Sequence, residues 1–178
     1  MDCRLPSKWL REHLTERQLI PYVLDAAAGD SSARLEGFTH ADTVLVSETS
    51  GFAVIFEAKV SADISYEITF DMMRNQIARY IDVMLEKPTE QSPPLSRRLP
   101  EKTLFVLVTP RMFREHWRSR LYGRVMNEYW SDPDKLGEDI PHREQLDCAG
   151  IVRRLGWITW EDCNAVLPAA CSWLVSGR

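Results

Sequence analysis

Residues 42–59 read DTVLVSETSGFAVIFEAK, and this stretch decides the fold that the sequence predicts. Two short apolar runs, VLV and FAVIF, flank SETSG, whose small polar residues and final glycine are typical of a hairpin turn. Antiparallel pairing of the two runs would bring Asp42 close to Glu57. Because Glu57 and Lys59 are two residues apart on one strand, their side chains should point to the same face. We therefore expect two carboxylates and one ammonium group at one end of a hairpin.

A third strand is predicted at residues 103–109, TLFVLVT, which have an unbroken apolar centre. A long helix is expected between the hairpin and this strand, so the strand should run parallel to the Glu57 strand through a right-handed crossover. The apolar character of all three runs favours a sheet that is covered on both faces, in which the charges near Glu57 interrupt a core.

Composition limits the classes of function. The chain has 178 residues, enough for one domain with a full core, and its 22 Lys and Arg against 26 Asp and Glu give a formal charge of −4. Any nucleic-acid binding must therefore rely on a local basic patch. We expect no membrane span and no signal peptide, and the four cysteines lack C-x-x-C spacing, which favours reduced thiols in the cytoplasm.

Three helices are expected around this core. Residues 6–14 could form a short amphipathic helix, and residues 15–29 carry apolar residues at helical spacing, with Glu16 in the first turn. A longer helix is predicted from about Thr69 to Glu86 by its apolar stripe. Gln76 and Tyr80 are four residues apart in it, so they should share one face.

Asp42, a hairpin and then Glu57-Ala58-Lys59 resemble the PD-(D/E)xK nuclease superfamily, which has the restriction-endonuclease-like fold. The proline that the family name places before the aspartate is Ala41 here. The resemblance implies that Asp42 and Glu57, with the Ala58 carbonyl as a third ligand, hold Mg2+ or Mn2+. It also implies that Lys59 orients the attacking water. Oxygen ligands of this kind suit Mg2+, which acidifies bound water and stabilises charge on phosphate.

Two further residue patterns are similar to branches of that superfamily. Glu16, in E-R-x-L-I, resembles the first-helix acid of archaeal Holliday-junction resolvases, although it also suits the dipole of a helix N-terminus. Gln76 and Tyr80 form a Q-x-x-x-Y that is similar to the motif of RecB-like and CRISPR-associated exonucleases, where it organises the active site or the substrate phosphate. Tyr80 could equally be an ordinary core residue.

The rest of the chain adds weaker signals. A helix is expected over residues 111–130, with five arginines that form either a solvated face or a contact to a nucleic-acid backbone. Residues 87–102 hold four prolines and are expected to be a surface loop for substrate or partner contacts. His40, Glu48 and Asp63 flank the predicted site, and structural roles are favoured for all three.

The predicted architecture is α/β, with an αβββαβ restriction-endonuclease-like core, a mixed central sheet flanked by helices, and a mainly helical C-terminal addition. Residues 1–130 would form the nuclease-like core and residues 131–178 an extension packed on the same domain: an acidic loop, a helix at 145–155, a GWITW strand or turn, and a last helix interrupted at Pro168.

The expected function is metal-dependent hydrolysis of phosphodiester bonds in nucleic acid, with DNA as the expected substrate. One alternative is a nuclease-fold module that binds nucleic acid or a protein without catalysis, because fold alone does not establish activity. Another is an unrelated α/β domain with a surface salt bridge at the hairpin end. Many members of the superfamily dimerise, so a homodimer is a further arrangement that the resemblance implies.

Overall fold

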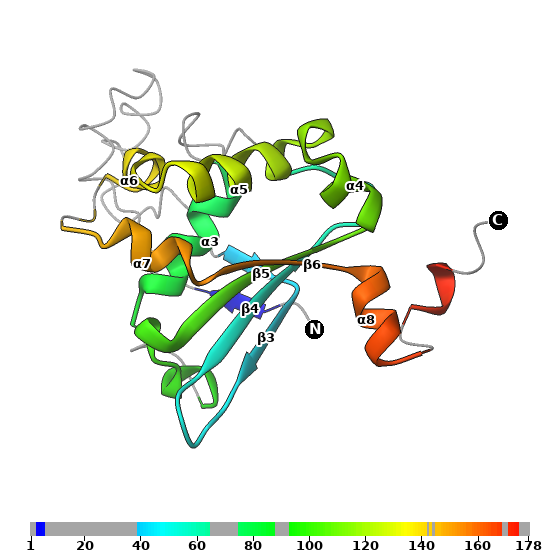
Figure 1. Ribbon diagram of the computed structural model, residues 1–178. Coiled ribbons are helices and arrows are strands. Elements are labelled where there is room, and N and C mark those ends of the chain that lie inside the picture. Colours follow the sequence, from blue (N-terminus) through cyan, green and yellow to red (C-terminus); the bar gives the residue numbers. More distant parts are fainter. Residues whose placement is uncertain are drawn as a thin grey trace, which may run out of the picture.

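The computed structural model describes residues 3–5, 39–64, 75–87, 93–141, 143, 145–168 and 171–174. This part of the chain is an α/β structure with a four-stranded sheet and a separate two-stranded sheet (Figure 1). The strands are β1 (Cys3–Leu5), β2 (Thr39–Ala41), β3 (Thr43–Val46), β4 (Ala53–Ala58), β5 (Thr103–Thr109) and β6 (Leu155–Thr159). The helices are α3 (Gln76–Leu85), α4 (Arg111–Glu115), α5 (Leu121–Ser131), α6 (Asp134–Asp139), α7 (Cys148–Val152) and α8 (Trp160–Val166), with short 3-10 turns η2 (Leu95–Arg97), η3 (Pro100–Lys102), η4 (Trp117–Ser119) and η5 (Ser172–Leu174).

The predicted hairpin is confirmed. β3 and β4 pair antiparallel, with Thr43 opposite Phe56, and the turn is closed by a hydrogen bond of 2.8 Å from the Ser47 amide to the Phe52 carbonyl. Gly51 has φ +69, which favours glycine, and a Cβ at this position would lie 2.6 Å from Cγ of Leu99. The turn therefore depends on a glycine for both its backbone conformation and its close contact with residue 99.

The four-stranded sheet has the order β3-β4-β5-β6 and is mixed. β4 and β5 are parallel with α3 between them in sequence, as predicted, and β6 pairs parallel to β5 at the edge. The bounds of β5 agree with the predicted strand. β6 contains most of GWITW, so the C-terminal region contributes a strand to the central sheet in addition to its helices.

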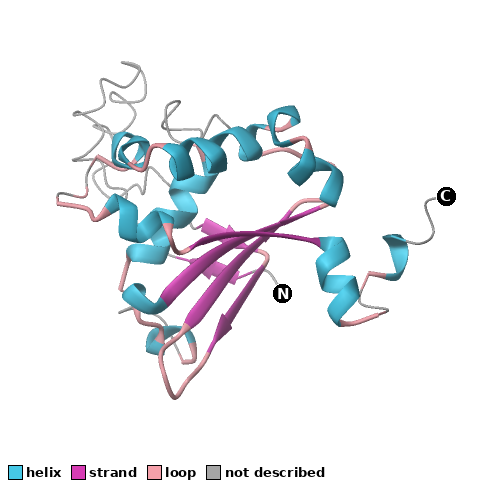
Figure 2. Ribbon diagram, viewed as in Figure 1, coloured by secondary structure: helices cyan, strands magenta, loops and turns pink. Residues whose placement is uncertain are grey.

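The predicted mixed sheet flanked by helices is confirmed, although the described helices cover mainly one of its two faces. Side chains along β4 alternate between buried and half-buried, and β6 follows the same pattern. The buried face packs against α3, α5 and α7, whereas no described helix covers the other face (Figure 2). The apolar residues on the second face are therefore half-buried, and the sheet has one main core.

Asp42 lies where the chain passes from one sheet to the other. β2 pairs antiparallel with β1 in the two-stranded sheet, and β3 begins immediately after Asp42. The predicted αβββαβ core would place a further strand before the hairpin in the central sheet, but the described strand of this region, β2, pairs with β1 in the separate sheet. Residues 35–38 lie outside the described residues.

The described part of the predicted helix of residues 69–86 is α3, which begins after Asn75, whereas residues 69–74 lie outside the described residues. Asn75 has φ −74 and ψ 161, an extended conformation, and its side chain accepts a 2.9 Å hydrogen bond from the Ala78 amide, so it is the N-cap of α3. The Asn75 amide group also donates to the Tyr129 hydroxyl at 2.9 Å and to Asp139 Oδ2 at 2.9 Å. Buried polar contacts with α5 and α6 thus fix the position at which α3 starts.

The predicted helix of residues 111–130 is divided into α4, η4 and α5. Arg120 interrupts it with an extended backbone, φ −132 and ψ 147, immediately before α5. The chain folds back closely here, because a Cβ on Gly123 would lie 2.1 Å from the Trp117 carbonyl oxygen. The helical period of the sequence continues through this break, so tertiary packing overrides the local preference.

Three further expectations need correction. The acidic loop after residue 131 contains α6, and the helix expected at 145–155 is the shorter α7, since β6 begins at Leu155. The described part of the 87–102 segment is no simple surface loop, because Arg98 within it is buried. The predicted helices at 6–14 and 15–29 lie outside the described residues. No helix in the described ranges is long and apolar enough to span a membrane.

The first turn of α5 is held by a residue that is distant in sequence. Asp63 Oδ2 accepts a hydrogen bond from the Leu121 amide at 2.8 Å, and Oδ1 accepts from the Tyr122 amide at 3.2 Å. Arg120, the N-cap residue, makes no capping bond with its own side chain. Asp63 therefore satisfies donors that a helix N-terminus leaves without partners.

We expect Asp63→Ala to lower the free energy of unfolding by about 1–2 kcal/mol, the usual effect of losing an N-terminal capping group. Urea unfolding followed by circular dichroism would measure this change. Asp63→Asn keeps one oxygen acceptor and should lose less. Equal stabilities of both variants and the wild type would contradict the capping role.

Candidate functional site

The end of β4 places an acid and a base side by side. Glu57 and Lys59 project from the same face, as their spacing predicts, and Nζ of Lys59 lies 2.7 Å from Oε1 of Glu57. The Glu57 side chain is 6% exposed and the Lys59 side chain is 14% exposed. An ion pair with so little water around it interacts more strongly than a surface pair, and each charge depends on the other for compensation.

The first turns of α3 complete the surroundings of this pair. Gln76 donates from Nε2 to Oε1 of Glu57 at 3.2 Å, and its Oε1 accepts from Lys59 Nζ at 3.5 Å. One turn further along, the Tyr80 hydroxyl hydrogen bonds to Oε2 of Glu57. The same hydroxyl lies 2.5 Å from the backbone carbonyl oxygen of His40. Both residues of the Q-x-x-x-Y pattern therefore contact the Glu57 carboxylate.

Asp42 approaches the site from the β3 side of β4, which is opposite to the side that pairs with β5. Its exposed carboxylate accepts a 2.7 Å hydrogen bond from the Ala58 amide through Oδ2. The next amide along β4, that of Lys59, donates to Val108 of β5 at 2.8 Å, so the Ala58 amide faces the β3 side. In an extended strand the N–H and C=O of one residue point the same way, which places the Ala58 carbonyl at the edge where Asp42 lies.

The protonation properties of the site follow from burial. Removal from water raises the pKa of the Glu57 carboxyl above its ordinary value, while contacts with Lys59 and Tyr80 oppose this shift and the charge of Asp42 adds to it. Burial and the nearby Glu57 charge also raise the pKa of the Tyr80 hydroxyl, so Tyr80 is a neutral hydrogen-bond donor at physiological pH. The charge of Asp42 also adds to the raised pKa of the Tyr80 hydroxyl.

Trp160 makes a contact with the site that the sequence did not predict. Its indole Nε1 donates a 3.0 Å hydrogen bond to the backbone carbonyl of Lys59, and its ring meets the ring of Trp173 edge-on, with centroids 5.7 Å apart. Trp160 follows β6 directly, as Lys59 follows β4. Parallel strands bring these two positions to the same end of the sheet. The C-terminal region therefore supports the backbone that carries Lys59.

The remaining candidates lie apart from this cluster or outside the described residues. Glu16 is outside them. The Glu48 carboxylate pairs with Arg97 near the hairpin turn, and Asp63 caps α5. His40 contributes its backbone carbonyl to the site and has an exposed side chain. Within the described ranges no three or more His, Cys, Asp and Glu side chains form a group that could hold a metal ion.

Comparisons with known proteins were made against family models, curated proteins and solved structures. No family model matches the sequence, and no curated protein or solved structure matches the chain. The function has to be argued from the site itself.

Proposed function

We propose that this protein is a metal-dependent nuclease of the PD-(D/E)xK type that hydrolyses phosphodiester bonds in nucleic acid, with DNA as the substrate. The observation that carries the proposal is the buried contact of 2.7 Å between Glu57 and Lys59. Asp42 lies beside the same strand end, and Gln76 and Tyr80 contact the glutamate from α3. An antiparallel hairpin followed by a helix and a parallel strand also matches the ββαβ part of the αβββαβ order of a restriction-endonuclease-like core.

The oxygen atoms at this strand end fit a hard divalent cation. A carboxylate offers about four lone-pair directions, and Lys59, Gln76 and Tyr80 use three of those on Glu57. Asp42 accepts its hydrogen bond through Oδ2, and Oδ1 accepts none from the described residues. Asp42, Glu57 and the Ala58 carbonyl would hold Mg2+ or Mn2+ together with water ligands, as Mg2+ commonly requires. The bound cation would acidify water and stabilise negative charge on the phosphate.

The protein side chains would prepare the site for this reaction. The Lys59 ammonium would orient the attacking water and offset charge on the phosphate. Gln76 contacts both Lys59 and Glu57 and would fix their relative position, while Tyr80 would hold the second glutamate oxygen. We also propose that Glu16 tunes the metal or acts through a water molecule.

The proposal is tested by cleavage of labelled single- and double-stranded DNA with Mg2+ or Mn2+. We expect the wild type to cut and the Asp42→Asn and Lys59→Ala variants to lose about 100-fold or more, the range found when a group that stabilises transition-state charge is removed. Asp42→Asn is informative because the amide oxygen can still accept the Ala58 hydrogen bond while the charge is lost.

Glu48→Gln is the matched control, because it removes an exposed carboxylate that pairs with Arg97 away from the proposed site. This variant should cut at the wild-type rate. If folded wild-type protein cuts no DNA, the nuclease proposal fails and the non-catalytic binding module becomes the better interpretation. Cleavage that survives both site substitutions would show that the site is elsewhere or that the activity is a contaminant.

A further inference from the structure

The most basic stretch of the chain runs from α4 through η4 to the end of α5. Residues 111–131 contain five arginines and two glutamates, in a chain whose formal charge is −4. The structure separates the arginines into two groups. Arg111 and Arg114 both lie near Asp162 of α8, with nitrogen–oxygen distances of 3.3 and 3.5 Å. These two charges therefore already have an acidic partner within the protein.

The other three, Arg118, Arg120 and Arg124, form no ion pair with any carboxylate of the described residues. Instead, Arg118 lies over the ring of Trp117 at 4.4 Å and Arg120 over the ring of Phe113 at 4.3 Å. Arg124 Nε donates to the backbone carbonyl of Arg118 at 2.9 Å. These contacts hold three guanidinium groups in place without neutralising their charge.

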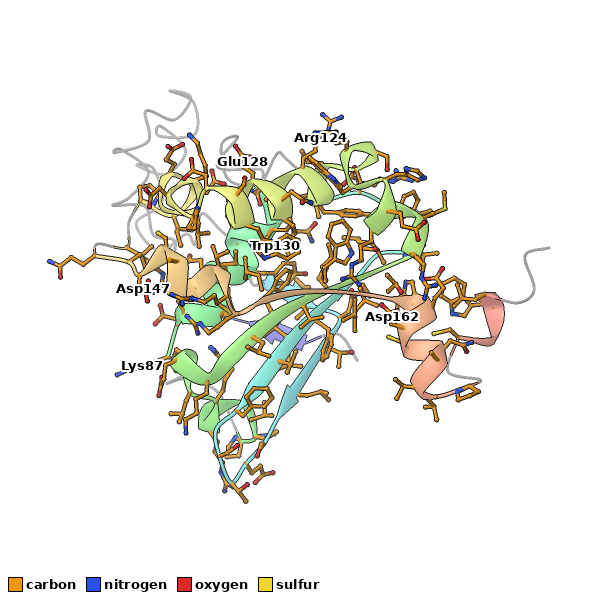
Figure 3. The ribbon with its side chains drawn as sticks, in the orientation of Figure 1. Lys87, Arg124, Glu128, Trp130, Asp147 and Asp162 are labelled. Carbon is orange, nitrogen blue, oxygen red and sulfur yellow. The ribbon has the colours of Figure 1, made fainter. Side chains whose placement is uncertain are left out.

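Arg120 is half-buried, and one of its donors has no partner in the described structure. Its Nε atom is buried and has no acceptor in the described structure, whereas buried donors in folded proteins nearly always have one. Arg118 and Arg124 are exposed, and Arg124 projects from the outer side of α5, away from the sheet (Figure 3). The segment thus combines fixed arginines with access from solvent.

We propose that Arg118, Arg120 and Arg124, here called the arginine surface, bind the phosphate backbone of nucleic acid. The inference rests on the proposed nuclease function, for which it supplies a contact to the substrate outside the reacting centre. Guanidinium groups bind phosphate through two parallel hydrogen bonds, and stacking on an aromatic ring leaves the edges of the group available for this.

Asp63 links the arginine surface to the candidate site, because it follows the site closely in the chain and hydrogen bonds to the backbone next to Arg120. Asp63 follows Lys59 by four residues and holds the first two amides of α5, immediately after Arg120. The same contact shows that the α5 N-terminus is already occupied by a carboxylate, so the arginines themselves must bind the phosphates. Glu128 also lies on the outer side of α5 and would oppose extension of the contact further along the helix (Figure 3).

The test is DNA binding by the full chain in EDTA, measured by fluorescence anisotropy at several salt concentrations. Without divalent metal, binding is read independently of cleavage. Three phosphate contacts, at about 0.9 in the logarithmic salt slope for each, predict that raising salt from about 50 to about 200 mM weakens binding about 40-fold. Substituting all three arginines with glutamine should remove this component of the salt dependence and weaken binding by about tenfold or more at low salt.

The control variant replaces Arg97, Arg114 and Arg153 with glutamine. All three are exposed, and the change in net charge is the same. We expect the control to bind as the wild type does. Circular dichroism checks folding, and if the triple variant does not fold, Arg118→Gln and Arg124→Gln alone should each lower the salt slope by about 0.9.

Equal binding by the two triple variants would overturn the inference, as would a wild type that does not bind DNA at low salt. Polyglutamate that competes as well as DNA would also overturn it, in favour of an acidic protein partner. The expected binding pattern together with an inert cleavage assay would leave the arginine surface standing and reject the nuclease. Cleavage that does not depend on these arginines would support the nuclease and reject the arginine surface.

Discussion

Replacing Lys59 with methionine is expected to abolish the proposed cleavage and to lower the free energy of unfolding by about 3 kcal/mol. The loss of stability arises because Glu57 is 6% exposed and would keep a buried carboxylate without its counter-charge. Methionine has a similar length and no charge, so the effect reports on the ion pair more than on packing. Urea unfolding at neutral pH measures the change.

The loss of stability in Lys59→Met should depend on pH in a direction that follows from the pKa of Glu57. Burial raises the pKa of the folded-state Glu57 carboxyl above 4.5, and removing Lys59 removes an interaction that opposes this shift. A carboxyl whose pKa is higher in the folded state binds more protons when folded, so stability falls as pH rises through the unfolded-state value. The deficit of Lys59→Met relative to the wild type should therefore shrink at pH values below 4.5 and be largest above the raised folded-state pKa.

The double variant Lys59→Met with Glu57→Gln separates stability from activity. With both charges gone, glutamine can still contact Tyr80 and Gln76, so most of the lost stability should return. Activity should not return, because both proposed roles have been removed. A Lys59→Met protein as stable as the wild type across the pH range would contradict the buried ion pair, and a double variant less stable than either single variant would contradict the coupling.

Local patterns in the sequence predicted the centre of this site. Alternation along β4 fixes the face of Glu57 and Lys59, and turn chemistry at residues 47–51 fixes the hairpin. The four-residue spacing of Gln76 and Tyr80 places both on one helix face in the same way. Each of these relations depends on residues that are close in the chain, and each is visible in sequence for that reason.

Long-range contacts account for what the sequence did not predict. The side chain of Asn75, which begins α3, hydrogen bonds to Tyr129 and Asp139. Directly after the break at Arg120, the Leu121 amide donates to the Asp63 carboxylate. Trp160 contacts Lys59 across 101 residues. Nothing in the local pattern around any of these residues distinguishes it from an ordinary loop or helix residue. The acid-base cluster was therefore predictable, and the residues that hold it in place were not.

Arg98 is the second residue whose replacement should have a large effect. Its side chain is buried and hydrogen bonds to the carbonyl oxygens of Val83, Met84 and Glu86 at 3.1, 2.6 and 2.6 Å. These carbonyls lie at the C-terminal end of α3, which carries the negative end of the helix dipole and leaves carbonyls without amide partners. The Val83 oxygen also accepts the Glu86 amide at 3.1 Å. Burial lowers the pKa of Arg98 to about 10, so the guanidinium stays charged at physiological pH.

We expect Arg98→Met to lower the free energy of unfolding by about 3–5 kcal/mol, because it removes a buried charge together with the side-chain donor of the Met84 and Glu86 carbonyls. Arg98→Lys should recover part of this, since one ammonium group cannot reach all the acceptors of a guanidinium fork. The adjacent Arg97 provides the matched control. It is 52% exposed and pairs with a Glu48 that is 55% exposed, so Arg97→Gln should change stability by less than about 1 kcal/mol.

The comparison of residues 97 and 98 also tests how α3 is held against the sheet. Gln76 and Tyr80 belong to the N-terminal half of this helix, and Arg98 binds its C-terminal end. If Arg98 acts only by holding that end, Arg98→Lys should keep its cleavage rate at temperatures where it remains folded, while unfolding at lower urea concentration. Equal stability of the Arg97→Gln and Arg98→Met proteins would show that the helix end is held by other contacts.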